Sequence, residues 1–144
     1  MNDDTLARRC VDAMWKSDSA SKALGMQVDS IAKGRAQVSM TVRDDMVNGH
    51  DLCHGGMIFS LADSAFAFAC NSENQSAVAA SCSIDYVRPA RRGDTLVAKA
   101  AVVNQGKRSG LYDVTISNQE NQLIAEFRGR SARLGHPLLH EDIE

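Results

Sequence analysis

The chain has few of the features that mark membrane, secreted or nucleic-acid-binding proteins. Its net charge is −2, with no run of like charges, so it lacks the basic field that draws a protein to nucleic acid. No apolar run reaches the roughly 20 residues that a membrane span needs. The acidic start, Met1 to Asp4, is unlike a secretory signal. We therefore expect a soluble, cytoplasmic protein that contacts neither nucleic acid nor membrane.

Cysteine pairs and metal-binding clusters are also missing. Cys10, Cys53, Cys70 and Cys82 form no Cys-x-x-Cys pair, and in a reducing compartment such residues are small buried hydrophobes. A metal could use the spacing of His50, Cys53 and His54, or that of His136 and His140. Neither group has the neighbours that would complete four ligands, so we predict no metal site.

Hydrophobic periodicity divides the rest of the chain into helices and strands. Residues 3–16 carry an apolar stripe at helical spacing, and 26–42 alternate apolar and polar side chains about a turn at Lys33–Gly34. Residues 44–53 have neither period and are expected to form a loop. Four more strand-like segments, separated by turn residues, cover 77–87, 95–104, 110–117 and 122–133.

A long helix is expected between these strands, over residues 55–72, with apolar side chains on nearly every face. Such a helix must be wrapped by the rest of the protein, and short turns favour antiparallel pairing of the strands. We therefore predict an α+β fold in a single domain, residues 1–144. A curved antiparallel sheet wraps one long central helix, and a short helix precedes it. Residues 136–144 are expected to fray.

Asp63 interrupts the apolar central helix, where a carboxylate is costly to bury. Two interpretations stay open. Either the hydroxyls of Ser60 and Ser64 or a backbone N–H satisfy it, or it lies in a mostly apolar cleft that raises its pKa and leaves it to a substrate or water.

The same helix opens with His54-Gly55-Gly56. Glycine allows close packing there, yet it also lets a carbonyl oxygen approach the free N–H groups of the first turn. His54 is either a structural hydrogen-bonding residue or a catalytic one. Asn48, in the preceding loop, either forms a turn or orients a water or substrate.

Basic residues gather in two turns after the central helix. The first turn has Arg88, Arg91 and Arg92 around Pro89, and the second has Lys107 and Arg108 after Gly106. A solvated edge explains such charges. If the two turns meet at one end of the sheet, however, they form a cationic patch suited to the phosphates of an acyl carrier.

These residues resemble the phenylacetic acid degradation thioesterases of the PaaI type, a family of hotdog-fold acyl-CoA thioesterases. The resemblance covers roughly residues 8–135 and rests on HGGMIFSLADSAFAFACNS, SIDYVRPARRGDTLVAKA, QGKRSGLYDV and FRGRSARLG. It implies a hotdog fold and hydrolysis of aryl-acyl-CoA thioesters such as phenylacetyl-CoA or hydroxyphenylacetyl-CoA, in phenylacetate degradation. No cofactor is implied, because coenzyme A is part of the substrate.

The resemblance also implies roles for individual residues. Asp63 resembles the catalytic carboxylate, Gly55 the oxyanion donor, Asn48 the residue that positions water, and His54 a neighbour that holds the loop. The substrate and its coenzyme A are expected against Gly56, Arg88, Pro89, Arg91, Gly106, Lys107 and Arg108. Some relatives carry a water-orienting serine where this chain has Ala79, with Ser81 two residues later.

The distance between His54 and Asp63 along the helix leads us to predict an oligomer. Nine helical residues separate His54 from Asp63 by roughly 13 Å, too far for one thioester carbonyl to touch both. The resemblance implies homodimers that pair into homotetramers, with each active site at a subunit interface. Asp63 acts as base or as nucleophile. A non-catalytic acyl-CoA binding protein and a hotdog-fold hydratase or dehydratase are the alternatives.

Overall fold

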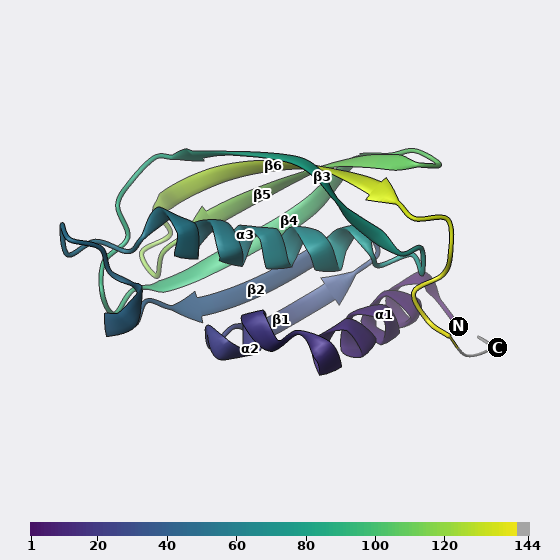
Figure 1. The fold of residues 1–144 in the computed structure, drawn as a ribbon, viewed down its shortest axis with the longest axis horizontal. Helices are drawn as coiled ribbons and strands as arrows, with labels where there is room; N and C mark the ends of the chain where they lie inside the picture. The colour runs from purple at the N-terminus through teal and green to yellow at the C-terminus, as the bar shows by residue number, and fades with distance from the viewer. Residues whose placement is uncertain (141–144) are drawn as a thin grey trace.

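The computed structural model describes residues 1–140 as a six-stranded antiparallel sheet curved around one long helix (Figure 1). This helix, α3, spans Gly55–Cys70. Helices α1 (Asp3–Ser17) and α2 (Ser19–Ala23) pack against it. The strands, in the order β1-β2-β4-β5-β6-β3, are β1 Gln27–Ala32, β2 Arg35–Thr41, β4 Thr95–Gln105, β5 Ser109–Ser117, β6 Leu123–Arg133 and β3 Ala77–Tyr86. The predicted fold class is confirmed.

The boundaries expected from periodicity agree with the structure to within two residues, but one helix was missed. At five residues, α2 is too short to show a helical period. Asp18 caps it by accepting hydrogen bonds from Ser21 N (3.0 Å) and Ser21 Oγ (2.7 Å). The expected loop over 44–53 contains a turn of 3₁₀ helix, η1, at Asp44–Met46.

Aromatic side chains pack α3 against the sheet. The Phe66 ring lies 5.7 Å from the rings of both Tyr112 and Phe127, and Trp15 of α1 packs on Phe68. One stripe of α3 remains only half-buried: Phe59, Ser60, Asp63, Ser64 and Ala67. The expectation that the helix is wrapped on every side is therefore wrong for the face that carries Asp63.

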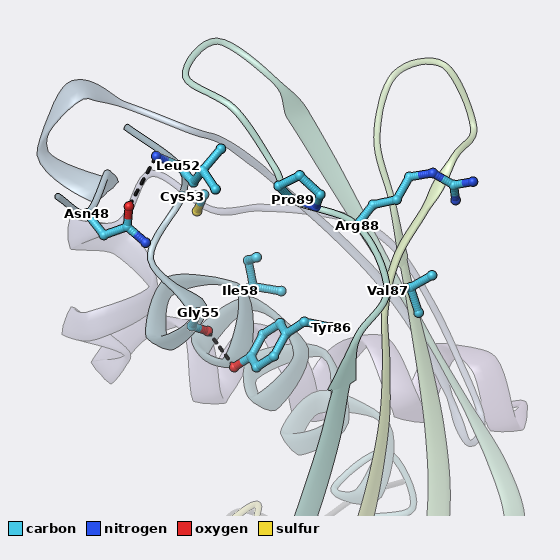
Figure 2. A pocket seen from close by; sticks show the side chains of 9 residues that line it. All are labelled: Asn48, Leu52, Cys53, Gly55, Ile58, Tyr86, Val87, Arg88 and Pro89. Carbon is cyan, nitrogen blue, oxygen red and sulfur yellow. Dashed lines mark hydrogen bonds between the residues drawn. The ribbon is translucent and has the colours of Figure 1, made fainter. Parts of the chain in front are cut away.

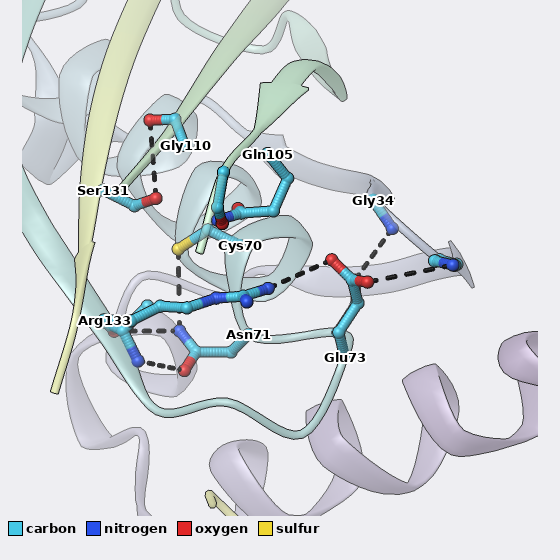
Figure 3. A network of polar contacts seen from close by, with 12 residues as sticks. Gly34, Cys70, Asn71, Glu73, Gln105, Gly110, Ser131 and Arg133 are labelled. Carbon is cyan, nitrogen blue, oxygen red and sulfur yellow. Dashed lines mark hydrogen bonds and ion pairs between the residues drawn. The ribbon is translucent and has the colours of Figure 1, made fainter. Parts of the chain in front are cut away.

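Two buried polar residues, Asn71 and Ser72, tie the end of α3 to the sheet, and Figure 3 shows Asn71 there. Asn71 Nδ2 donates to the Ala77 carbonyl oxygen (3.0 Å), and Asn71 Oδ1 accepts from Ala77 N (2.9 Å). Ser72 Oγ accepts from Gly34 N (2.8 Å) and donates to the Ala69 carbonyl oxygen (2.7 Å). These bonds satisfy polar groups in the core. They explain why the segment Ala-Cys-Asn-Ser, residues 69–72, stands at the end of α3.

The C-terminal segment is anchored as far as the structure describes it. The His136 carbonyl oxygen accepts from Ser76 N (2.9 Å), and Leu139 N donates to Asn74 Oδ1 (2.8 Å). Leu139 itself is buried. The expected fraying is therefore not found over residues 136–140, and residues 141–144 of that expected tail lie outside the described residues.

Cys10, Cys53 and Cys70 are buried free thiols, as predicted, whereas Cys82 is half-buried. Within residues 1–140, no three His, Cys, Asp or Glu side chains come together in a group that could hold a metal ion. The helices in that same part of the chain are all too short or too polar to span a membrane.

Gly129 on β6 tests the packing of Phe66. A Cβ at Gly129 would lie 2.8 Å from the Phe66 ring, whereas a Cβ at Gly49 meets nothing within 4 Å. We expect Gly129→Ala to lower the free energy of unfolding by about 1–3 kcal/mol through overpacking. Gly49→Ala should stay within about 0.5 kcal/mol of wild type. Urea denaturation at one protein concentration compares them, and equal stabilities would contradict this account of the core.

Candidate active site

Asp63 lies halfway along α3 between two cavities. One, of about 410 Å³, is bounded by α2 and the half-buried stripe of α3. The other, of about 230 Å³, opens toward the start of β3. Ser60 Oγ donates to the Gly56 carbonyl oxygen (2.8 Å), and Ser64 Oγ lies 2.8 Å from Ser21 Oγ. Neither serine satisfies the carboxylate, which receives no hydrogen bond or ion pair from any residue between 1 and 140.

This setting changes the acidity of Asp63. Burial raises the pKa of the carboxyl group, and the negative charge of Asp18 across the larger cavity raises it further. A carboxylate with a raised pKa and an open cavity on each side is a stronger base than an exposed one and has room for water or substrate. Of the two interpretations of Asp63, the geometry favours a carboxylate left to a substrate or water over one satisfied by neighbouring serines.

The first turn of α3 leaves fewer N–H groups free than the Gly-Gly sequence suggested. His54 Nδ1 accepts from Gly56 N (3.2 Å), and the His54 carbonyl oxygen accepts from Met57 N (2.9 Å). Gly55 N–H has no acceptor within residues 1–140. His54 is thus the helix cap, and since its Nδ1 accepts, a neutral ring carries its proton on Nε2. Gly55 N–H alone remains available to an oxyanion.

Asn48 forms the turn that the sequence allowed and keeps its amide nitrogen free of the loop. Its Oδ1 accepts from His50 N (2.9 Å) and Leu52 N (3.2 Å), which shapes the loop before α3. Its amide nitrogen is directed toward the cavity beside Gly55 (Figure 2). With its oxygen committed to the loop, Asn48 can only donate a hydrogen bond to a molecule in that cavity.

The cavity at Gly55 has a volume of about 300 Å³ and is lined by Asn48, Leu52, Cys53, Gly55, Ile58, Tyr86, Val87, Arg88 and Pro89 (Figure 2). Burial raises the pKa of the Cys53 thiol to about 11, so this sulfur stays protonated and is a poor nucleophile. None of these lining residues also lines either cavity at Asp63. Within one chain, the structure does not bring Gly55 and Asp63 together.

The two basic turns do not meet within one chain either. The first turn precedes β4 and the second follows it, so the eleven residues of β4 hold them about 33 Å apart. Arg92 forms ion pairs with Asp44 and Asp51. The guanidinium of Arg88 extends away from the other residues that line the Gly55 cavity (Figure 2). The single patch expected if these turns met is therefore wrong for one subunit.

The strand after α3 brings no hydroxyl to Asp63. Ala79 lines the smaller cavity at Asp63 and pairs with Ser131, whose side chain is buried. An irregularity between Ala79 and Ser81 shifts the register, so Ser81 is exposed opposite the exposed Arg130. A water at Asp63 must be oriented by other groups.

Two site residues were not singled out from the sequence. Asp18 lines the larger cavity at Asp63, and Tyr86 Oη donates to the Gly55 carbonyl oxygen (2.8 Å). Tyr86 stands two residues before Arg88 in a segment that carried the family resemblance. No pattern in the sequence, however, indicates which residue of α3 it meets.

A long helix inside a curved antiparallel sheet, with a free N–H at its entrance and a carboxylate at its middle, is an arrangement suited to acyl transfer. The sequence profile of the thioesterase superfamily matches residues 50–125. The chain belongs to this superfamily, as the sequence resemblance predicted.

Individual relatives agree with this assignment. The acyl-coenzyme A thioesterase PaaI of Escherichia coli K12 is 51% identical over 129 residues, which cover 90% of this chain and 92% of that protein. The structure of the E. coli PaaI protein from the phenylacetic acid degradation operon has a TM-score of 0.93 at 48% identity, covering 94% of this chain and 99% of that one. A Streptococcus mutans UA159 protein bound to acetyl CoA has a TM-score of 0.76 at 30% identity, covering 78% and 90%.

Asp63 is expected to reduce stability at neutral pH. Because folding raises its pKa, the native state favours the protonated form, and stability falls as pH rises from below the usual aspartate value through the raised one. Asp63→Asn should therefore unfold at higher urea than wild type at pH 7, and the difference should vanish in acid.

Asp113→Asn is the matched control, and its expected effect on stability at neutral pH is the opposite of that of Asp63→Asn. The hydrogen bond from Arg128 lowers the pKa of Asp113, so this carboxylate stabilises the fold above its usual pKa and the effect is lost in acid. Urea midpoints at a series of pH values compare the two variants. A neutral-pH loss of stability in Asp63→Asn would show that its carboxylate is satisfied in the native protein.

Proposed function

We propose that the protein is an acyl-CoA thioesterase whose active sites form between two copies of the chain. The observation that carries this proposal is the separation of the two site halves. Gly55 N–H opens into one cavity and the Asp63 carboxylate into others, and neither has a partner within the described residues of its own chain. A thioester carbonyl needs both groups.

The edge strand β3 offers a way to join the halves. It pairs with β6 on one side only. Val78 and Tyr86 in this strand, and Val87 directly after it, are 49–50% exposed. A ten-residue edge strand with exposed apolar side chains is a template for another strand. Antiparallel pairing of two β3 strands about a two-fold axis would set the Tyr86 end of one copy, with Gly55, beside the Val78 end of the other, with Asp63.

The same pairing explains the two basic turns. An antiparallel partner reverses the ends of the sheet, so Arg88 and Arg91 of one copy face the same end as Lys107 and Arg108 of the other. Within residues 1–140, no ion pair occupies the side chains of Arg91, Lys107 or Arg108, which leaves them for the phosphates of coenzyme A. We propose that coenzyme A also passes along Gly56, Pro89 and Gly106.

Hydrolysis then follows from the groups in place. The thioester oxygen accepts from Gly55 N–H, which stabilises the negative charge that develops on it. Asp63 either removes a proton from a water that attacks the carbonyl carbon, or attacks that carbon itself to give an anhydride that water opens. In both routes the C–S bond breaks and the thiolate of coenzyme A leaves. In the base route Asp63 returns its proton to that thiolate, and in the anhydride route the thiolate takes a proton from solvent. Asn48 donates to the water or substrate, and no cofactor is required.

The lining of the larger cavity at Asp63 favours an aryl-acyl substrate that carries a ring hydroxyl. Its apolar wall includes Leu24, Met26 and Phe59. Ser21 Oγ donates to Asp18 Oδ2, so the hydroxyl of Ser64 must donate to Ser21 Oγ. The polar wall therefore presents acceptors, which suit a phenolic O–H. We propose that the acyl group of hydroxyphenylacetyl-CoA occupies this cavity, in keeping with the phenylacetic acid degradation operon of the E. coli relative.

The assembly and its place in the cell belong to the same proposal. We propose that dimers joined through β3 pair into homotetramers in the cytoplasm, where free buried thiols such as Cys70 persist. A non-catalytic acyl-CoA binding protein would bind the thioester without releasing free thiol. A hydratase would instead change the absorbance of an enoyl-CoA. A thiol-release assay therefore separates all three functions.

Shared sites predict complementation between two inactive variants. Asp63→Asn should lower kcat by at least about a hundredfold, and Gly55→Ala should also impair turnover because its Cβ would lie 3.1 Å from the Tyr86 ring. After co-refolding in equal amounts, about a quarter of wild-type activity should return, since half of randomly paired two-fold dimers contain one intact site. Separately refolded variants mixed at the end are the control. If no activity is regained, each site lies within one chain.

The acyl cavity predicts a preference for hydrogen-bond donors. Wild type should release thiol from a ring-hydroxylated phenylacetyl-CoA with a kcat/KM roughly fivefold to tenfold above that for its methoxy counterpart, because only the hydroxyl donates to the cavity. Asp63→Asn should release little thiol from either compound. Aliphatic acyl-CoAs of similar length complete the panel, and a methoxy substrate that matches the hydroxyl compound would contradict this view of the cavity.

A further inference from the structure

We infer that Tyr86 is a positioning residue that, together with His54, fixes the direction of the Gly55 N–H. This inference rests on the proposed thioesterase function, in which that N–H stabilises the oxyanion. It assigns a role to the phenol at the end of β3, the strand whose other end lines the smaller cavity at Asp63.

Tyr86 and His54 hold the two polar ends of one peptide unit. The carbonyl of Gly55 and the N–H of Gly56 belong to the same peptide plane. Tyr86 Oη donates to that carbonyl oxygen (2.8 Å), and His54 Nδ1 accepts from that N–H (3.2 Å). Since each peptide unit is planar, holding both ends of this unit fixes its orientation. The free N–H belongs to the preceding unit, whose His54 carbonyl oxygen accepts from Met57 N (2.9 Å), so Tyr86 and His54 Nδ1 restrain the N–H through the Gly55 backbone that joins the two units.

Gly55 needs such a restraint. Glycine has more backbone freedom than any other residue and weakens a helix by roughly 0.5–1 kcal/mol relative to alanine. Two consecutive glycines at a helix start therefore favour fraying, whereas an oxyanion donor must keep its position. The Tyr86 ring also lies against Gly55, because a Cβ added to Gly55 would be 3.1 Å from both the ring and its oxygen (Figure 2). Tyr86 thus restrains Gly55 by contact as well as by hydrogen bond.

The hydroxyl of Tyr86 can be removed without disturbing the core. Tyr86 is 50% exposed at the end of an edge strand, whereas the only other tyrosine, Tyr112, is 1% exposed. Tyr112 Oη also forms one hydrogen bond, to Gln105 Oε1 (2.7 Å), at the opposite end of the sheet from Gly55. The two tyrosines therefore form a matched pair of hydroxyl deletions, one beside the Gly55 N–H and one at the opposite end of the sheet of the same chain.

The test compares Tyr86→Phe with Tyr112→Phe in thiol release from hydroxyphenylacetyl-CoA. Tyr86→Phe should lower kcat roughly fivefold to tenfold, the value of one hydrogen bond, with KM within about twofold of wild type. Tyr112→Phe should leave kcat unchanged and lower only the resistance to urea. Sedimentation and circular dichroism check that both variants keep the assembly and fold of wild type.

A second measurement covers a Tyr86→Phe protein that fails to fold or assemble. In the Tyr112→Phe background, biosynthetic 3-fluorotyrosine replaces Tyr86 alone and keeps its hydroxyl. Because a phenolate cannot donate, the more acidic fluorophenol should move the alkaline fall of kcat to lower pH. Cys53 and Arg88 are the other titratable groups that line this cavity, and both are identical in the labelled and unlabelled proteins.

The outcomes separate this inference from the proposed function. Wild-type kcat in Tyr86→Phe, a loss confined to KM, or an unmoved alkaline limb in the fluorotyrosine protein overturns the role of Tyr86 while the thioesterase stands. Absence of thiol release from the wild-type protein overturns the proposed function itself. A lower kcat at unchanged KM, or a shifted alkaline limb, supports the positioning role.

Discussion

The packing of α3 against the concave face of the sheet is the interaction on which the rest of the structure depends. Phe66 contacts Tyr112 and Phe127, while the polar bonds of Asn71 and Ser72 hold the end of the helix. With the helix fixed along its length, its entrance and its middle become two separate places for chemistry. The sheet cannot cover the whole helix, and the stripe left half-buried is the one that carries Asp63.

The two places are built in opposite ways. At the entrance, hydrogen bonds to His54 occupy the N–H groups of Gly56 and Met57, so in the first turn of α3 the Gly55 N–H is the one left without a partner among the described residues. At the middle, the serines next to Asp63 bind elsewhere, and the carboxylate keeps a raised pKa. Within the described residues of one chain, an unsatisfied donor and an unsatisfied acceptor are thus held apart, and the proposed pairing of two copies would join them.

Much of this architecture could be predicted from the sequence. The alternation of residues 36–42 and the apolar run after Gly55 predicted strands and a central helix, and the family resemblance predicted the thioesterase superfamily; both are confirmed. The helix α2 was missed because five residues show no period. The cationic patch within one subunit was wrong because one turn precedes β4 and the other follows it, which places them at opposite ends of that strand. The subunit interface and the residue roles stay predictions.

By itself, the sequence determined the elements, the family, and the nine-residue spacing between His54 and Asp63, because periodicity and motifs are local properties of the chain. Only the tertiary structure decided which N–H remains free, that neighbouring serine hydroxyls do not hydrogen-bond to Asp63, and which side chain restrains Gly55. These depend on contacts between distant segments: Tyr86 lies 31 residues from Gly55, and Ser21 lies 43 from Ser64. A hydrogen bond has one donor and one acceptor at a fixed distance, and only the folded chain determines which groups meet.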